Sequence, residues 1–126
     1  MSEADIKQAI KVEVETNFLP GSSTRDKFAF AYHITIKNQG DEGVQLLSRY
    51  WLITDGNGNK MEVSGEGVVG KQPVIMPGEN YQYSSGAMLE TPVGTMQGFY
   101  TMERLDGGQF NAAIPIFSLA VPHLVN

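Results

Sequence analysis

Residues Gly65–Gly70 contain a glycine pattern that binds phosphate when it follows a strand and opens a helix. Its glycines, at the spacing GxGxxG, are Gly65, Gly67 and Gly70. Because glycines have no side chain, they allow backbone N–H groups to approach a pyrophosphate at the start of a helix. Pro73 and Pro77 follow closely, and proline interrupts a helix because it lacks an N–H group. We therefore expect a structural loop between strands; an anion site built from backbone amides, with Lys71 as counter-charge, is the alternative.

A second pattern resembles a calcium-binding loop. Asp55 and Glu66 occupy the first and last ligand positions of an EF-hand, but Lys60 stands where that loop needs its glycine. The Asn-Gly pair just after Asp55 favours a tight hairpin instead. His33 and His123 have no partner at metal-ligand spacing. We expect no metal site, and a divalent-metal-responsive protein that uses Asp55 and Glu66 is the remaining alternative.

No set of residues in the sequence indicates catalysis. The chain has no cysteine, which excludes thiolate nucleophiles and disulfides. It also lacks the G-x-S-x-G motif of serine hydrolases, and no pair of carboxylates can be assigned to acid-base chemistry. We expect a non-enzymatic protein without a cofactor.

Aromatic residues are the other candidates for a functional surface. Those that we select for partner binding are Tyr50, Trp51, Tyr81 and Tyr83. All lie in predicted strands, where aromatic side chains commonly fill a core. However, bulky residues point to both sides of the strand predicted for residues 44–54, so one side could present an apolar patch to a partner.

Alternation of apolar and polar residues with a period of two predicts the elements that carry these residues. The predicted strands are Ile10–Phe18, Phe28–Lys37, Val44–Thr54, Lys60–Ser64, Glu79–Ser84, Met96–Arg104 and Gln109–Phe117. About seven to eight short antiparallel strands indicate an all-β sandwich. Pro115 predicts an edge position or an interruption in the last strand. Residues 1–9 are expected to form a flexible N-terminal segment despite a possible capping box at Ser2–Asp5.

Composition excludes several classes of function. The 126 residues carry a net charge of −5, and the nine Lys and Arg residues are scattered, so no basic patch for nucleic acid is expected. No apolar run reaches the roughly 18 residues that span a bilayer, and the acidic start of the chain is unlike a signal peptide. We expect one cytoplasmic domain with no membrane insertion.

Several segments, in order, resemble the ApaG family. They are residues 49–55, 65–73 and 77–79, Tyr81, Tyr83, Ser85-Gly86, Thr91-Pro92 and the run Gly94-x-Met96-x-Gly98-x-Tyr100. The resemblance implies a fibronectin type III or immunoglobulin-like sandwich over residues 10–126, protein-protein recognition and no enzymatic activity. It also implies an association with cobalt resistance and magnesium efflux.

The sequence as a whole favours an interaction module. We expect it to bind an unknown protein partner through a sheet face or an exposed edge strand, as a monomer or weak homodimer. A phosphate- or nucleotide-binding protein that uses the Gly65–Gly70 loop is the main alternative.

Overall fold

The protein, in a computed structural model that describes residues 3–122, consists of one short helix, one 3-10 turn and eight strands. In chain order these are α1 (Glu3–Ala9), β1 (Ile10–Phe18), η1 (Pro20–Ser22), β2 (Phe28–Asn38), β3 (Val44–Asp55), β4 (Lys60–Glu66), β5 (Val74–Ile75), β6 (Asn80–Leu89), β7 (Val93–Arg104) and β8 (Gln109–Ala120). No helix in residues 3–122 is long and apolar enough to cross a membrane.

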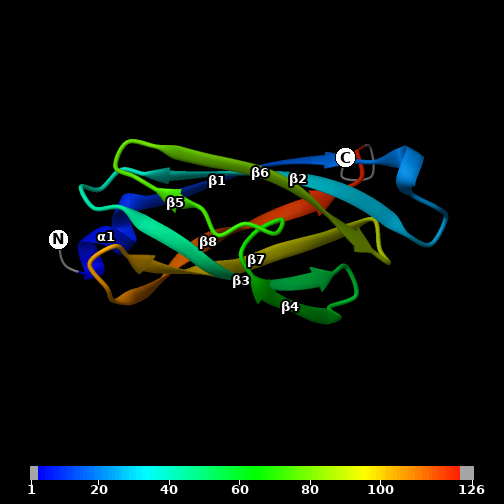
Figure 1. Ribbon diagram of the computed structural model, residues 1–126. Coiled ribbons are helices and arrows are strands. Elements are labelled where there is room, and N and C mark those ends of the chain that lie inside the picture. Colours follow the sequence, from blue (N-terminus) through cyan, green and yellow to red (C-terminus); the bar gives the residue numbers. More distant parts are fainter. Residues whose placement is uncertain (1–2, 123–126) are drawn as a thin grey trace.

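The strands form two antiparallel sheets packed face to face, as Figure 1 shows. One sheet has three strands in the order β1-β2-β6, and the other has the order β4-β3-β7-β8, with β5 paired to the start of β3. The prediction of an all-β sandwich is confirmed.

Alternation along the strands places large apolar side chains between the sheets. On β2, for example, Phe30, Tyr32, Ile34 and Ile36 are buried on one face, as period-two geometry requires. On β3, Trp51 is 2% exposed. Its ring contacts Tyr32 of the opposite sheet at a centroid distance of 5.4 Å, so aromatic packing joins the two layers.

The N-terminal segment differs from the expectation of flexibility. Residues Glu3–Ala9 form helix α1, and Ile6 is wholly buried in the core. The end of the helix is tied down because the Gln39 amide donates to the Ala9 carbonyl at 2.9 Å. One buried isoleucine therefore holds a segment whose length alone would not sustain a helix.

The prediction for Pro115 is confirmed. Strand β8 lies at the edge of its sheet, and its register with β7 shifts between the pairs Met96–Phe117 and Gly98–Ile114. Pro115 lies within this irregularity, where its missing N–H group costs no ladder hydrogen bond.

The sandwich is closed along one side and open along the other. On the closed side, β1 and β8 approach each other. On the open side, the three-stranded sheet ends at β6 while the five-stranded sheet continues to β4. Among residues 3–122, the inner face of β4 therefore has no strand opposite it.

We predict that Ile6→Ala lowers the free energy of unfolding by about 2–4 kcal/mol, because it removes most of a wholly buried side chain. Urea unfolding monitored by circular dichroism measures the change. Lys7→Ala is the matched control, since Lys7 is exposed on the same helix; equal stability of both variants would contradict a structural role for α1.

Candidate functional site

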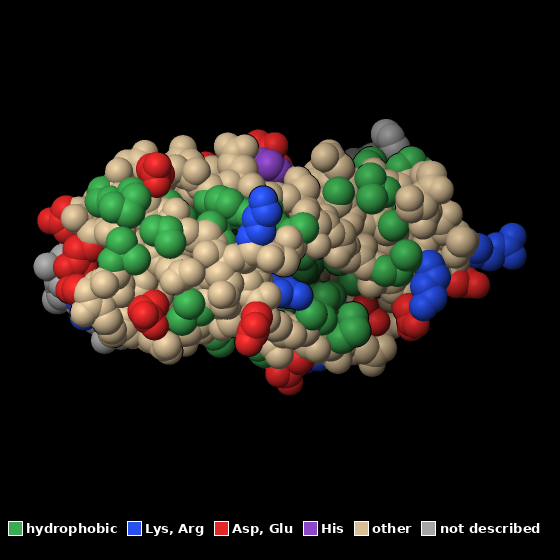
Figure 2. All heavy atoms as spheres, in the orientation of Figure 1, with side chains coloured by type: hydrophobic (Ala, Val, Ile, Leu, Met, Phe, Trp, Pro, Cys, Tyr) green, Lys and Arg blue, Asp and Glu red, His purple; other side chains and the backbone are tan. Residues whose placement is uncertain are grey.

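The open side of the sandwich forms a groove between β4 and β6, which we call the inter-sheet groove. Its floor is the inner face of β3 and β4, where Met61 and Val63 pair with the buried Ile53 and Trp51. Although they point inward, Met61 and Val63 are 51% and 36% exposed. Figure 2 shows a recess with hydrophobic side chains in this region.

Small residues of β6 form the opposite wall. Ser85 and Ala87 pair with Tyr32 and Phe30, which are buried on the inner face of β2. Ser85 and Ala87 therefore also face inward, yet they fill little of the space between the sheets. The groove is consequently lined with apolar surface on its floor and with small side chains on its wall.

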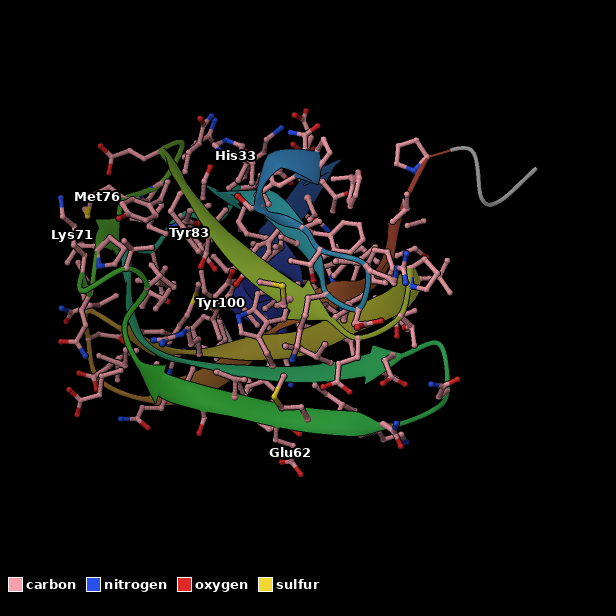
Figure 3. All side chains as sticks on the ribbon, turned by 90° about the vertical axis from the view of Figure 1, so that its right-hand side faces the viewer. His33, Glu62, Lys71, Met76, Tyr83 and Tyr100 are labelled. Atoms are coloured by element: carbon pink, nitrogen blue, oxygen red, sulfur yellow. The ribbon has the colours of Figure 1, made fainter. Side chains whose placement is uncertain are left out.

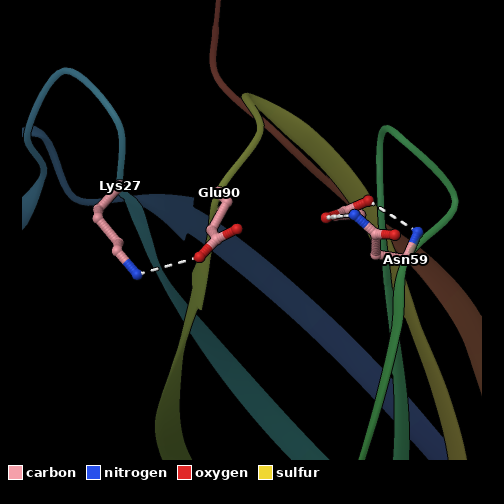
Figure 4. Close-up of polar contacts among 4 residues, drawn as sticks. Lys27, Asn59 and Glu90 are labelled. Atoms are coloured by element: carbon pink, nitrogen blue, oxygen red, sulfur yellow. Dashed lines mark hydrogen bonds and ion pairs between the residues drawn. The ribbon is translucent and has the colours of Figure 1, made fainter.

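The groove widens at one end into a hollow of about 420 Å³. Its lining residues are Lys27, Ile53, Asp55, Asn59, Lys60, Met61, Met88, Leu89 and Glu90. We call this end of the groove its mouth. Two polar contacts flank it (Figure 4): Lys27 and Glu90 form an ion pair at 3.3 Å, and Asn59 donates to Asp55. The ion pair is largely exposed, and such pairs contribute at most about 1 kcal/mol.

The other end of the groove is closed by the chain that crosses between the sheets after β4. Several hydrogen bonds fix this crossover to β3; among them, Gly67 N and Gln72 Nε2 donate to Leu47 O, and Leu46 N donates to Pro73 O. The floor of the groove therefore ends immediately beyond Arg49.

Arg49 lies at this closed end. It pairs with Gly65 on one side and with the buried Tyr100 on the other, so it faces the space between the sheets. Its Nη1 donates to the carbonyl oxygens of Glu66 at 3.0 Å and Gly67 at 2.9 Å. A Cβ at position 65 would lie 3.1 Å from Nη1 and Nη2; glycine at this position therefore makes room for the guanidinium group.

Two tyrosines lie beside Arg49, between the sheets (Figure 3). The hydroxyls of Tyr83 and Tyr100 are hydrogen-bonded to each other at 2.5 Å. Burial raises the pKa of both hydroxyls far above their usual range, while the charge of Arg49 acts in the opposite direction. Both tyrosines are therefore neutral near pH 7.

The glycine motif forms a hairpin turn. Val68 and Lys71 exchange backbone hydrogen bonds at 2.8 and 3.0 Å, and Val69 and Gly70 between them have φ angles of +49° and +75°. Positive φ at both central residues is typical of a type I′ turn. No helix follows, since the next element is β5, so the loop has the structural form that we expected.

The loop amides are largely committed to this turn. The N–H groups of Gly67, Val68 and Lys71 already donate to backbone carbonyls, and Lys71 is exposed. An anion would have to compete with these bonds. The geometry therefore offers no preformed nest from these three amides, whereas Nε and Nη2 of Arg49 beside them have no hydrogen-bond partner among residues 3–122.

The two carboxylates of the calcium-like pattern do not meet. Asp55 precedes the hairpin that begins β4, and Glu66 ends β4, about 20 Å away at the usual rise per residue. The Asp55 carboxylate accepts hydrogen bonds from the Asn57 and Asn59 amides. Within the described residues, no three His, Asp or Glu side chains are grouped as a metal site requires.

The histidines are not brought together either. His33 lies on β2 in contact with two side chains of β6: its Nδ1 is 2.8 Å from Ser84 Oγ, and its Nε2 is 3.3 Å from Gln82 Oε1. His123 lies outside the described residues.

The four selected aromatic residues occupy different environments. Trp51 and Tyr83 are buried and belong to the core. Tyr50 lies on the outer face of its sheet, where it stacks on Phe99 at 5.0 Å and donates to Glu62. Tyr81 is half-buried on β6 and contacts the Tyr83 ring.

Sequence reasoning missed the three residues that define the groove, Arg49, Met61 and Val63. Arg49 appeared only as part of a motif, because its inward direction depends on a bulge in β3 between Leu46 and Ser48. Met61 and Val63 alternate with charged and polar residues in an ordinary strand pattern. Their exposure follows from the number of strands in the other sheet, which local sequence does not encode.

Comparison with known proteins identifies the family. A model described as the ApaG domain matches residues 20–104. The chain belongs to the ApaG family. ApaG proteins from Enterobacter sp. (strain 638) and Aromatoleum aromaticum are 56% and 52% identical, over 91% and 100% of this chain and 94% and 100% of their own lengths.

The fold is also found in a solved structure. An X-ray structure of a target of the Northeast Structural Genomics Consortium superposes with a TM-score of 0.90 at 47% sequence identity, covering 94% of this chain and 92% of that one. The sandwich described above is therefore shared with a close relative of known structure.

We predict unequal costs for alanine at two glycines of the motif. Gly67 and Gly70 both have positive φ, but a Cβ at Gly67 would lie 2.3 Å from the Lys71 carbonyl oxygen, whereas a Cβ at Gly70 meets no atom within 4 Å. We expect Gly70→Ala to cost about 1 kcal/mol and Gly67→Ala about 2–4 kcal/mol. Chemical denaturation measures both, and similar costs would refute the close approach.

The buried tyrosine pair predicts alkaline unfolding. Above pH 10 the unfolded chain releases tyrosine protons that the native state keeps, so the free energy of unfolding falls as pH rises. Each such tyrosine contributes a slope of about 1.4 kcal/mol per pH unit. Tyr100→Phe should reduce the slope between pH 10.5 and 11.5 by this amount, as measured by urea unfolding at several pH values, and Tyr83→Phe should do the same. An unchanged slope in both variants would show that these hydroxyls ionise in the native protein.

Proposed function

We propose that this member of the ApaG family is a non-enzymatic interaction module that binds a protein partner in the inter-sheet groove. The observation that carries the proposal is the exposure of Met61 and Val63 on the inner face of β4. Apolar side chains that face inward but remain exposed indicate a surface that another chain covers.

The groove suits an extended segment of a partner. Strand β6 ends its sheet, so one edge of its backbone has no neighbouring strand within the described residues. An added strand beside β6 would become the fourth strand of that sheet and would lie over Met61 and Val63. Backbone hydrogen bonds would then provide affinity, and alternate side chains would provide specificity.

The remaining parts of the proposal follow from the family and the composition. We propose that the protein acts in the cytoplasm, as a monomer or weak homodimer, and without a cofactor. Cobalt resistance and magnesium efflux, which the family resemblance implies, are the proposed setting of the interaction.

Site-specific photo-crosslinking in cells tests this proposal. With p-benzoylphenylalanine in place of Met61, we expect a covalent adduct with a protein partner. Val63→Glu in the same chain should remove the adduct, because a carboxylate would be buried on binding. The variant should still fold, since Val63 is partly exposed.

The matched control places the crosslinker at Ile116. This residue is more exposed than Met61, at 61%, but it lies on β8, at the opposite edge of the same sheet. Adducts that are the same from both positions, or none from position 61, would refute the groove as the binding site.

A further inference from the structure

The closed end of the inter-sheet groove has more hydrogen-bond donors than acceptors. Arg49 has five N–H donors, and its two hydrogen bonds in the structure both come from Nη1. No carboxylate in residues 3–122 forms an ion pair with it. A half-buried guanidinium group paired only with backbone carbonyls keeps most of its charge uncompensated.

Neighbouring groups add to this excess. In the hydrogen bond between Tyr83 and Tyr100, one hydroxyl donates and the other accepts, so the accepting hydroxyl still carries a proton without an acceptor in the described chain. Trp51, two residues beyond Arg49 on the same face of β3, has a buried Nε1–H group without a partner among the described residues. Of these groups, Arg49 is the one that a ligand in the groove can reach, because Trp51 and Tyr100 are buried whereas Arg49 is half-buried.

The protein's own acidic side chains are directed elsewhere. Glu62 accepts a hydrogen bond from Tyr50 on the outer face of the sheet, and Glu62 and Glu66 alternate with the inward-facing Val63 and Gly65 along β4. Figure 3 shows Glu62 pointing away from Tyr83 and Tyr100. These acidic side chains therefore leave the closed end of the groove without a protein carboxylate within the described residues, so that an acceptor there is supplied by solvent or by a bound molecule.

A carboxylate matches this end of the groove better than a phosphate. A carboxylate has one negative charge and accepts two parallel hydrogen bonds from a guanidinium group. A phosphate would bring up to two negative charges to a half-buried site with one cation. The second nearby cation, Lys71, is exposed on the far side of the turn.

The shape of the groove indicates which carboxylate. The crossover is held against β3 at Leu46 and Leu47, so an extended chain that enters at the mouth cannot continue past Arg49. Such a chain runs from the Leu89 end of β6 towards its Asn80 end, antiparallel to β6, and terminates at Arg49.

We propose that the groove binds the C-terminal tail of a protein partner, with the terminal carboxylate on Arg49 and apolar side chains on Met61 and Val63. This inference rests on the proposed function and specifies its ligand. Arg49 and the Gly65 that makes room for it form the recognition site.

Matched peptides test the assignment. The probe is acetyl-Thr-Val-Thr-Val-Leu with a free C-terminus, compared with the same peptide as its C-terminal amide. Binding is followed by NMR through the indole N–H of Trp51, the protein's one tryptophan, and through the Arg49 Nε–H group. We expect the free acid to bind at least about tenfold more tightly, because the amide loses a charge-assisted hydrogen bond.

Substitutions assign the preference to Arg49. Arg49→Gln should bind the acid and the amide equally, Arg49→Lys should keep part of the preference, and the exposed Arg25→Gln should keep all of it. Amide spectra remote from the groove verify that each variant is folded. Equal binding of acid and amide by the wild-type protein, or a preference that survives Arg49→Gln, would overturn the proposal.

Three further probes separate other occupants. The amidated peptide acetyl-Thr-Val-Glu-Val-Leu should bind no more tightly than its neutral counterpart; tighter binding would indicate an internal acidic side chain. Inorganic phosphate should shift neither reporter group at concentrations where the acid binds. Concentration-dependent shifts without any peptide would indicate a second copy of this chain. Each of these contrary results would overturn the assignment to a partner's C-terminus.

Failure of the C-terminal-tail proposal can be distinguished from failure of the proposed protein-binding function. If neither peptide shifts a groove resonance, the C-terminal tail is excluded, while adducts from position 61 would still support protein binding in the groove. If acid and amide bind equally and Val63→Glu abolishes both, the groove is the binding site but Arg49 does not select a carboxylate.

Discussion

The packing of Trp51 between the two sheets is the contact on which the rest of the structure depends. Its ring meets Tyr32 of the opposite sheet, and also Phe117 and Tyr100 of β8 and β7, at centroid distances of 5.4 to 6.5 Å. The chain has no cysteine, so no disulfide joins the layers. Aromatic and aliphatic burial must therefore set both the separation of the sheets and the depth of the groove.

The unequal number of strands leaves part of this packing exposed as an apolar surface. With a neighbour beyond β6, the inner face of β4 would be ordinary core, and Arg49 would be fully buried. The three-stranded sheet instead stops at β6, so the same residues remain within reach of solvent. The inter-sheet groove thus needs no separate loop or insertion, because it is the part of the core that the smaller sheet leaves uncovered.

Much of the fold could be predicted from the sequence, because period-two alternation is a local signal. It located the seven long strands, and Pro115 marked an edge strand. Helix α1 and strand β5 were missed for a common reason: each is short, and each is held by tertiary contacts through one buried residue, Ile6 and Ile75. Local propensity carries little information about such elements.

The candidate site was harder to predict because it depends on two non-local features. The bulge in β3 reverses which residues point inward. Positions 46 and 51 would face opposite sides in a regular strand, but Leu46 and Trp51 both face the core. This reversal explains the bulk on both sides of the predicted strand. The glycine motif was correctly expected to be a loop, yet the role of Gly65 beside Arg49 became visible only when β4 was paired with β3.

The closed side of the sandwich also has a consequence for how the protein folds. Strand β1 ends at residue 18 and β8 begins at residue 109, so the seam between them joins segments that are distant along the chain. Such non-local pairing requires closure of a long loop before its contacts become favourable, which is typical of domains that fold in milliseconds to seconds. The hairpins of β3 with β4 and of β7 with β8 can form earlier, and the seam between β1 and β8 would then be among the last contacts made.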